Sequence, residues 1–329
     1  MPPPVRRYRA LSAYLRDRFG ARVRSVTIDA GFTCPNVDGT VTTGGCVYCD
    51  NRSFSPNRRL PRSTVRAQVE RGIEILSRRY KAERFIAYFQ AGTNTHGAVE
   101  KLRRLYDEAI DHPLVIGLAI GTRPDSVPDE VLDLLDGYAR RMPVWLELGL
   151  QTIHDRSLDW MNRGHHVDAF LDAVARCRGR GIELCTHVIL GLPGESHADM
   201  MATADLVASL PLSSVKVHNL YAVTGTPMAD MVERGEVRLL GRDEYVGILC
   251  DFLERLPPEM VIHRLQGEAP PEFLLGPSWC LDKPGLLAAV DAEFVRRDSR
   301  QGKGWRLREP ELPRTAARGD RLSLPLIAH

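Results

Sequence analysis

Residues 34–49 read Cys34-Pro35-Asn36-Val37-Asp38-Gly39-Thr40-Val41-Thr42-Thr43-Gly44-Gly45-Cys46-Val47-Tyr48-Cys49 and follow a short strand-like run, Val26–Gly31. Three thiols therefore fall within sixteen residues. A [4Fe-4S] cluster held by three thiolates keeps one iron without a protein ligand, and that iron can bind a small molecule and pass it an electron. The stretch thus predicts a loop at the end of a strand that carries a reactive centre.

The pair Cys46 and Cys49 taken alone also fits a zinc site or a redox dithiol. A structural zinc ion would need a fourth ligand nearby, but no second Cys-x-x-Cys and no histidine pair follows soon after. A catalytic zinc ion can use three protein ligands, so zinc stays an alternative. The glycines of this stretch allow the backbone to wrap closely around a bulky cluster. The residues favour iron–sulfur over zinc.

The bulk properties suit one large globular domain, or one domain with an appendage. The chain has 329 residues, of which 43% are hydrophobic and 26% charged. No run of about eighteen apolar residues occurs, so no membrane span is expected. The arginine-rich N-terminus lacks the apolar core of a signal peptide. We expect a cytoplasmic protein.

Four further cysteines are scattered along the chain: Cys177, Cys185, Cys250 and Cys280. A disulfide framework is not expected in a long chain without a secretion signal. These residues are more typical of small buried hydrophobic side chains. The role of Cys280 stays open, because it lies in a segment rich in glycine and proline.

Charge is unevenly distributed, although the net charge is only +2. Residues 1–24 hold seven arginines and one acidic residue, residues 52–84 hold ten basic and three acidic residues, and residues 296–321 hold nine basic and four acidic residues. The rest of the chain is acidic in compensation. Basic segments of this kind indicate a polyanionic partner such as RNA, and the simpler alternative is solvated helix faces.

Short apolar runs alternate with amphipathic stretches over most of the chain. The strand-like runs are Val26–Ala30, Phe85–Gln90, Leu114–Ile120, Val144–Leu150, Ile182–Leu190 and Val215–Leu220. Helix-like segments lie near 64–80, 97–111, 128–140, 166–180 and 197–209. This alternation predicts an α/β protein with a parallel sheet, and six strands fit a partial (β/α)6 barrel of the TIM type. We expect a core over 1–221 and a C-terminal extension over 222–329.

The order of the motifs resembles the radical S-adenosylmethionine (SAM) superfamily, and more closely its YhcC/YtqA branch, also called MnmL-like. The resemblance rests on Thr27–Asn36, Gly44–Cys49, Tyr88–Thr95, Glu147–Thr152, His187–Glu195, Lys216–Leu220 and Val261–Leu265. It covers roughly residues 8–303. Eleven residues separate Cys34 from Cys46, where the commonest superfamily form has three. The branch itself has this longer loop.

The resemblance implies a radical SAM fold and chemistry. Cys34, Cys46 and Cys49 would ligate three irons of a [4Fe-4S] cluster, and the fourth iron would chelate SAM. One electron from the cluster would cleave SAM into methionine and a 5′-deoxyadenosyl radical, which abstracts hydrogen from the substrate. A reducing partner such as flavodoxin or ferredoxin would supply the electron.

The resemblance also implies a set of SAM contacts, which are Gln90, Thr93, Asn94, Gln151, Arg163, His187 and Tyr48. The Gln90–Asn94 stretch would meet the amino acid part of SAM, and the arginine can pair with its carboxylate. His187 would contact the ribose, and Tyr48 would cover the cluster or stack on adenine. Plainer roles remain open: a surface charge for Arg163, a core histidine for His187 and packing for Tyr48. The Gly121-Thr122-Arg123 stretch lacks the acidic residue of some relatives.

The implied substrate is tRNA, at the C5 side chain of a wobble uridine in a carboxymethylaminomethyl or aminomethyl stage. The basic segments agree with such a polyanion. One alternative is a radical SAM enzyme acting on a small molecule or peptide. Another is a zinc-stabilised RNA-binding protein without catalysis.

Overall fold

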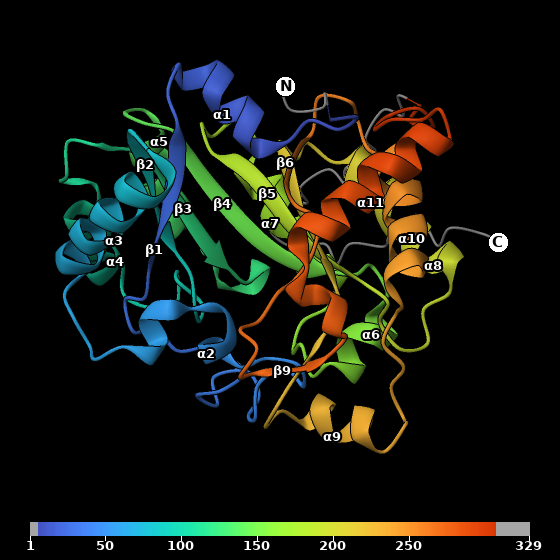
Figure 1. Cartoon of the computed structure of the whole chain (residues 1–329). Helices are drawn as coiled ribbons and strands as arrows, with labels where there is room; N and C mark the ends of the chain where they lie inside the picture. Colours follow the sequence, from blue (N-terminus) through green and yellow to red (C-terminus); the bar gives the residue numbers. More distant parts are fainter. Residues whose placement is uncertain (1–5, 307–329) are drawn as a thin grey trace.

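The computed structural model describes residues 6–306, in which one curved parallel sheet dominates (Figure 1). Its strand order is β1-β2-β3-β4-β5-β6-β8. The strands are β1 (Val23–Ile28), β2 (Arg84–Phe89), β3 (Val115–Thr122), β4 (Val144–Gln151), β5 (Glu183–Leu190), β6 (Ser214–Asn219) and β8 (Val261–Arg264). The predicted α/β partial barrel is confirmed. The sheet has one strand more than predicted, because β8 joins it from the part of the chain that we assigned to the extension.

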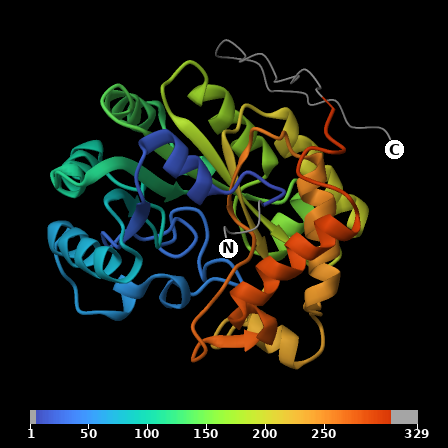
Figure 2. The same cartoon turned by 45° about the horizontal axis from the view of Figure 1, so that its top comes forward.

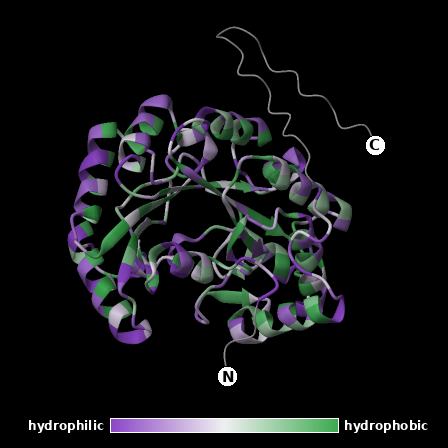
Figure 3. Cartoon of the chain, turned by 90° about the horizontal axis from the view of Figure 1, so that it is seen from above, coloured by the Kyte–Doolittle hydropathy of each residue, from purple (hydrophilic) through white to green (hydrophobic). Residues whose placement is uncertain are grey.

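The central strands form because their sequences are apolar enough to be buried on both faces. Every residue of β4 is buried, as expected for a strand in a parallel sheet covered by helices. The helices surround the sheet from outside (Figure 2), and their outward faces are mostly hydrophilic whereas the strands are mostly hydrophobic (Figure 3). The concave face of the sheet is therefore the inside of the half-barrel.

The helices follow the strands in alternation. They are α1 (Leu11–Phe19), α2 (Asn51–Phe54), α3 (Val65–Tyr80), α4 (Val99–Ile110), α5 (Asp129–Ala139), α6 (Asp155–Trp160), α7 (Val167–Cys177), α8 (His197–Ser209), α9 (Pro227–Glu233), α10 (Arg242–Arg255) and α11 (Lys283–Arg296), with short 3-10 turns at Pro56–Arg59, Pro124–Ser126 and Ser278–Leu281. Ser196 begins α8 with a capping box that pairs it with Asp199. The predicted helical segments are confirmed.

Helix α1 closes the amino-terminal end of the half-barrel (Figure 2). Leu15 packs there in a buried apolar cluster with Ile86 and Trp145. The segment before α1 runs along the edge strand β8, where Ala10 forms a parallel bridge to Ile262. Because this end is sealed, access to the inside is from the carboxyl ends of the strands.

The C-terminal part of the described chain packs on the last strands. A small antiparallel pair, β7 (Ala222–Val223) with β9 (Leu274–Gly276), lies below the large sheet in Figure 1, beside α9. The proposed division between 1–221 and 222–329 stays a prediction, and residues 307–329 lie outside the described residues. No helix within residues 6–306 is both long and apolar enough to cross a membrane.

Candidate active site

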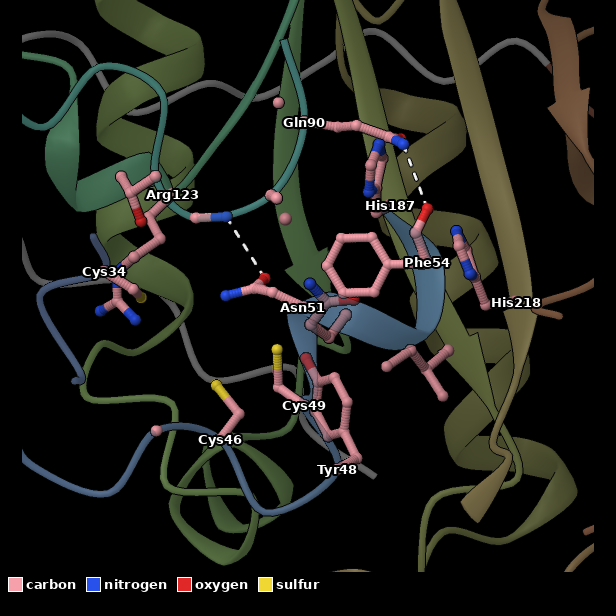
Figure 4. Close-up of a pocket in the computed structure, with 18 of the residues that line it drawn as sticks. Cys34, Cys46, Tyr48, Cys49, Asn51, Phe54, Gln90, Arg123, His187 and His218 are labelled. Atoms are coloured by element: carbon pink, nitrogen blue, oxygen red, sulfur yellow. Dashed lines mark hydrogen bonds between the residues drawn. The ribbon is translucent and has the colours of Figure 1, made fainter. Parts of the chain in front are cut away.

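A pocket of about 280 Å³ opens at the carboxyl ends of the strands. In α/β barrels this end carries the active site, because the loops that follow the strands meet there. The pocket is lined by all ten residues that the sequence predicted for the site: Cys34, Cys46, Cys49, Tyr48, Gln90, Thr93, Asn94, Gln151, Arg163 and His187. Figure 4 shows the cysteines and Tyr48 on one side of it and His187 on another. Their roles remain predictions, but their shared location is now established.

The three cysteines approach one another from a single loop after β1. All three are free thiols. Cys49 as a whole residue is exposed, but its sulfur points into the pocket (Figure 4). Desolvation there, together with the nearby Cys46 and Cys34, raises the pKa of the Cys49 thiol to about 12. Three thiolates can therefore coexist in this pocket only with a positive group between them.

The spacing of the sulfurs fits a cluster better than one ion. A tetrahedral zinc ion with Zn–S bonds of about 2.3 Å holds its sulfurs within about 4 Å of one another. Within residues 6–306, donor atoms of a suitable group lie within 4.8 Å of one another only at Glu147, Cys185 and His263, and not at the three loop cysteines. The three loop sulfurs are therefore not all within 4.8 Å of one another, which is wider than one tetrahedral zinc ion needs and is compatible with a four-iron cluster.

A network around Arg163 connects the cysteine loop to β4. Arg163 lies buried and donates from Nη1 to Cys46 Sγ at 3.7 Å and from Nη2 to the Gly149 carbonyl at 3.0 Å. Asn36 donates to the same sulfur at 3.6 Å and to the Arg163 carbonyl at 2.8 Å. Hydrogen bonds to cluster sulfurs tune the reduction potential. Arg163 is thus no surface helix charge, and the plainer interpretation is wrong.

The end of β4 holds its backbone in a strained form. Gln151 has φ 72°, in the left-handed region that residues with a side chain seldom adopt. A Cβ at Gly149 would lie 2.6 Å from both Arg163 Nη2 and Gln151 Nε2. A side chain at position 149 would therefore displace the ends of the Arg163 and Gln151 side chains from this wall. Such strain is typical of functional sites.

The end of β2 forms the neighbouring wall. Ala91 and Gly92 both have positive φ, 78° and 74°. A Cβ at Gly92 would lie 2.5 Å from the Phe32 carbonyl oxygen, so only glycine allows the β2 loop to approach the cysteine loop. Gln90 donates to the Phe54 carbonyl at 3.1 Å (Figure 4). The loop thereby holds Thr93 and Asn94 against the cysteines.

Two buried polar atoms in these walls lack a partner. Asn94 Oδ1 and Arg163 Nε are fully buried and bond to none of the described residues. Buried polar groups are normally satisfied, so these two indicate a missing ligand. An acceptor and a guanidinium donor match the ammonium and carboxylate of an amino acid. The donor set therefore fits a [4Fe-4S] cluster on the three cysteines with SAM beside it.

A buried ionic network lies inside the half-barrel, and several of its residues line the pocket. Glu147 on β4 is paired with the Lys216 ammonium and accepts from His187 Nε2 at 3.0 Å. Lys216 also donates to Tyr88 Oη at 3.1 Å. Burial alone would raise the pKa of Glu147, but Lys216 and His187 more than offset it and hold that pKa well below its usual range. Burial lowers the pKa of His187, so its imidazole is neutral at neutral pH.

The network already contains its own cation. Glu147, Cys185 and His263 could hold a metal ion by distance alone. The ammonium of Lys216, however, already neutralises Glu147. A divalent ion at the same carboxylate would be repelled by it. We therefore assign these residues to a structural ion cluster.

Removing the cation of this network should destabilise the protein strongly. In Lys216→Met, Glu147 stays buried without its partner, and we expect a loss of about 3–5 kcal/mol in the free energy of unfolding. The double variant Glu147→Gln/Lys216→Met should recover more than half of it. Lys283→Met is the matched control, because its surface pair with Glu268 is worth about 1 kcal/mol or less. Calorimetric unfolding of the four proteins checks this, and equal melting temperatures for the two single variants would contradict it.

Several residues that line the pocket were not predicted as site residues. They are Arg123, Lys216, His218, Tyr221 and Arg264. Arg123 donates to the Arg163 carbonyl at 2.8 Å and pairs with Asp125 at 2.6 Å, so it supports the wall and does not replace a ribose-binding carboxylate. Along β6, the polar residues Lys216 and His218 alternate with apolar valines. That alternation of polar residues within an otherwise apolar strand was the available signal.

The scattered cysteines are all buried, as expected. Cys280 lies in the 3-10 turn Ser278–Leu281, and its sulfur accepts a hydrogen bond from Asn219 at 3.1 Å. Burial raises the pKa of the Cys280 thiol to about 11. A protonated, buried thiol of this kind packs as a small hydrophobic group.

Comparisons with known proteins agree with this site. The chain matches the Radical SAM superfamily over residues 39–207 and the Radical_SAM C-terminal domain over residues 212–296. It is 40% identical over 309 residues to the uncharacterized protein YtqA of Bacillus subtilis (strain 168), covering 93% of this chain and 95% of that one. It is 37% identical over 302 residues to protein YhcC of Escherichia coli (strain K12), covering 92% and 96%.

More distant matches extend the comparison. A tRNA uridine(34) acetyltransferase of Methanocaldococcus jannaschii is 27% identical over 168 residues, which are 50% of this chain and 30% of that protein. The solved structure of Methanocaldococcus infernus Elp3 superposes with a TM-score of 0.62 at 18% identity, covering 85% of this chain and 64% of that one. This likeness confirms the fold. With its family models, its full-length relatives and a pocket suited to a [4Fe-4S] cluster and SAM, the chain belongs to the radical SAM superfamily.

Proposed function

We propose that this radical SAM enzyme modifies tRNA at the C5 side chain of a wobble uridine, at a carboxymethylaminomethyl or aminomethyl stage. The observation that carries the proposal is the position of the basic segment 52–59 at the mouth of the pocket. Asn51 and Phe54 of α2 line the pocket, and Arg52 lies between them. A polyanion held there would present one of its groups directly to the site.

An aromatic ring joins this basic segment. The guanidinium groups of Arg52 and Arg59 lie over the Phe273 ring, with centroid distances of 5.9 and 5.6 Å. Single-stranded RNA is recognised by cations for its phosphates and by aromatic or guanidinium planes for its unstacked bases. The name of the M. jannaschii relative refers to uridine 34 of tRNA. Both points support an anticodon loop as the ligand.

The other basic segments lie elsewhere. Gln301 donates from its backbone N–H to the Arg7 carbonyl, and Arg7 pairs with Asp298, so Arg7 and residues 298–301 lie together just before α1 begins. Arg297 is neutralised by Asp251 and Glu293. Within residues 52–59, Arg52 pairs with Asp50 and Arg58 with Asp29, so Arg59 is the arginine of this segment without a carboxylate partner among the described residues. We assign RNA binding at the site to residues 52–59 because this segment adjoins the pocket, which Asn51 and Phe54 line, whereas no described residue of the other two segments lines it.

The residues of the chain would have distinct roles in holding the cluster, orienting SAM and excluding water. When bound, the cluster and SAM supply a 5′-deoxyadenosyl radical that abstracts hydrogen from the substrate. Cys34, Cys46 and Cys49 hold the cluster, and Arg163 with Asn94 orients the amino acid part of SAM. Helix α1 seals the barrel and excludes water from below. The flavodoxin or ferredoxin that would deliver electrons stays a prediction.

Binding of tRNA should depend steeply on salt, because counterions are released from the phosphates. We expect Arg59→Gln to lower the slope of log Kd against log salt by about 0.7–0.9, as for one lost phosphate contact. Arg300 is an exposed arginine next to Gln301, so Arg300→Gln is the matched control and should leave the slope unchanged. Fluorescence anisotropy with labelled tRNA measures this.

A salt-independent affinity would contradict the tRNA proposal. It would favour the second candidate, a radical SAM enzyme that acts on a small molecule or peptide. That candidate predicts SAM cleavage by the reduced holoenzyme with no change when tRNA is added.

A further inference from the structure

Besides Arg163 at the cysteine loop, the pocket contains one arginine, among the described residues, whose charge no carboxylate neutralises. Arg264 ends β8 and lines the pocket beside His218 and Tyr221. It is half-buried, and within residues 6–306 its guanidinium forms no hydrogen bond and no ion pair, while its backbone pairs with β6 in the sheet. An arginine in a pocket is normally paired, because its guanidinium presents five donors.

The other cationic side chains of the pocket all have partners within the chain. Lys216 is paired with Glu147, and Arg123 is paired with Asp125. Arg163 donates to Gly149 and to the Cys46 sulfur. After these pairs are formed, Arg264 leaves the β6–β8 side of the pocket with an excess of positive charge.

His218 offers a second donor beside it. Its Nε2 is buried and without a partner among the described residues. Burial, followed by the charge of Arg264, lowers the pKa of His218 well below its usual range, so the ring is neutral and one nitrogen carries a proton. Gly267 allows the backbone after β8 to pack directly on the Tyr221 ring, since a Cβ there would lie 2.4 Å from that ring and 3.4 Å from His218 Nδ1.

We propose that Arg264 and His218 form a binding subsite for one carboxylate group of the substrate. One uncompensated guanidinium with one neutral imidazole matches a single negative charge, whereas a phosphate dianion would call for a further cation. The carboxylate of SAM has its own guanidinium in Arg163, which lies beside the cysteine loop and not on β8. The subsite itself is argued from Arg264 and His218. Only the assignment of the bound carboxylate to the C5 side chain of the uridine rests on the proposed function.

The first arm of the test uses a small probe, N-methylglycine, which carries a secondary amine and a carboxylate. Saturation-transfer NMR on the oxidised, reconstituted holoenzyme with SAM should detect its methyl group in the wild type. Arg264→Gln should reduce the signal about tenfold or more, and Arg264→Lys should reduce it less, because a charge-assisted pair is lost in the first and partly kept in the second. Dimethylamine, which lacks the carboxylate, should give no signal.

The second arm measures SAM affinity and turnover in the same proteins. The Kd of SAM should change by no more than about twofold in Arg264→Gln, as expected for sites without shared partners. Turnover of tRNA bearing carboxymethylaminomethyluridine should fall about 30-fold or more. Arg242→Gln, an exposed surface pair with Asp243, is the matched control for both arms.

The outcomes separate the two proposals. An N-methylglycine signal that is equal in wild type and Arg264→Gln overturns the subsite, and so does a SAM Kd that rises tenfold in that variant, because the bound carboxylate would then be that of SAM. A wild type that binds N-methylglycine through Arg264 but leaves tRNA unchanged retains the subsite and rejects tRNA as the substrate.

Discussion

Replacing Cys46 by alanine should abolish both iron incorporation and SAM cleavage. The other two sulfurs cannot hold a four-iron cluster that needs three protein ligands. Cys46 is also the sulfur to which Arg163 and Asn36 donate, so its replacement removes both of these hydrogen bonds. We expect 5′-deoxyadenosine formation at the background of a reaction without protein, measured by chromatography after anaerobic reconstitution and reduction.

Cys177→Ala is the matched control for that experiment. Cys177 is equally buried, but it ends α7 outside the pocket. Its replacement should cost about 1 kcal/mol of stability and leave cleavage intact. Cleavage that survives in Cys46→Ala, or that disappears in Cys177→Ala, would contradict the assignment of the cluster to the cysteine loop.

Replacing Arg163 by glutamine should raise the Kd of SAM about 30- to 100-fold, because a paired, charge-assisted hydrogen bond to a carboxylate is lost inside a buried site. Burial would lower the pKa of Arg163, but nearby Cys46 and Tyr48 raise it above its usual range, so the cation is always present. Equilibrium dialysis with labelled SAM measures the effect.

Two controls make the Arg163 result specific. Arg163→Lys keeps the charge without the planar fork and should fall between wild type and Arg163→Gln. Arg180→Gln removes a surface pair with Asp133 and should leave the Kd unchanged. Iron content must stay equal across the set, and a SAM Kd unchanged in Arg163→Gln at full iron content would remove Arg163 from the site.

The fold and the cysteine loop could be predicted from the sequence because both depend on local pattern, whereas the SAM contacts were implied by the resemblance and stay predictions. Buried strands such as β4 are continuous apolar runs, and the cysteines lie close together in the chain. The strand-like run Val261–Leu265 was placed in the extension because the alternation of strands and helices changes after Tyr221. Its membership of the large sheet depends on a distant neighbour, β6, which the local pattern does not reveal.

The buried ionic network of the site could not be predicted in this way. Glu147, Lys216 and His263 are far apart in sequence and look individually like ordinary polar residues of strands. Their pairing depends on the strand register, in which His187 lies opposite Lys216 and Lys216 opposite Arg264. Likewise, the lack of a partner for Arg264 becomes visible only when every neighbouring charge has been placed. His187 lines the pocket and is hydrogen-bonded to Glu147, and its contact with the ribose of SAM stays a prediction.

The most direct test of the account is anaerobic reconstitution of the full chain with iron and sulfide, followed by reduction in the presence of SAM, with 5′-deoxyadenosine and bound metal both quantified. The account predicts a brown protein that contains about four irons per chain and forms 5′-deoxyadenosine. A colourless protein that binds zinc and forms none would contradict it.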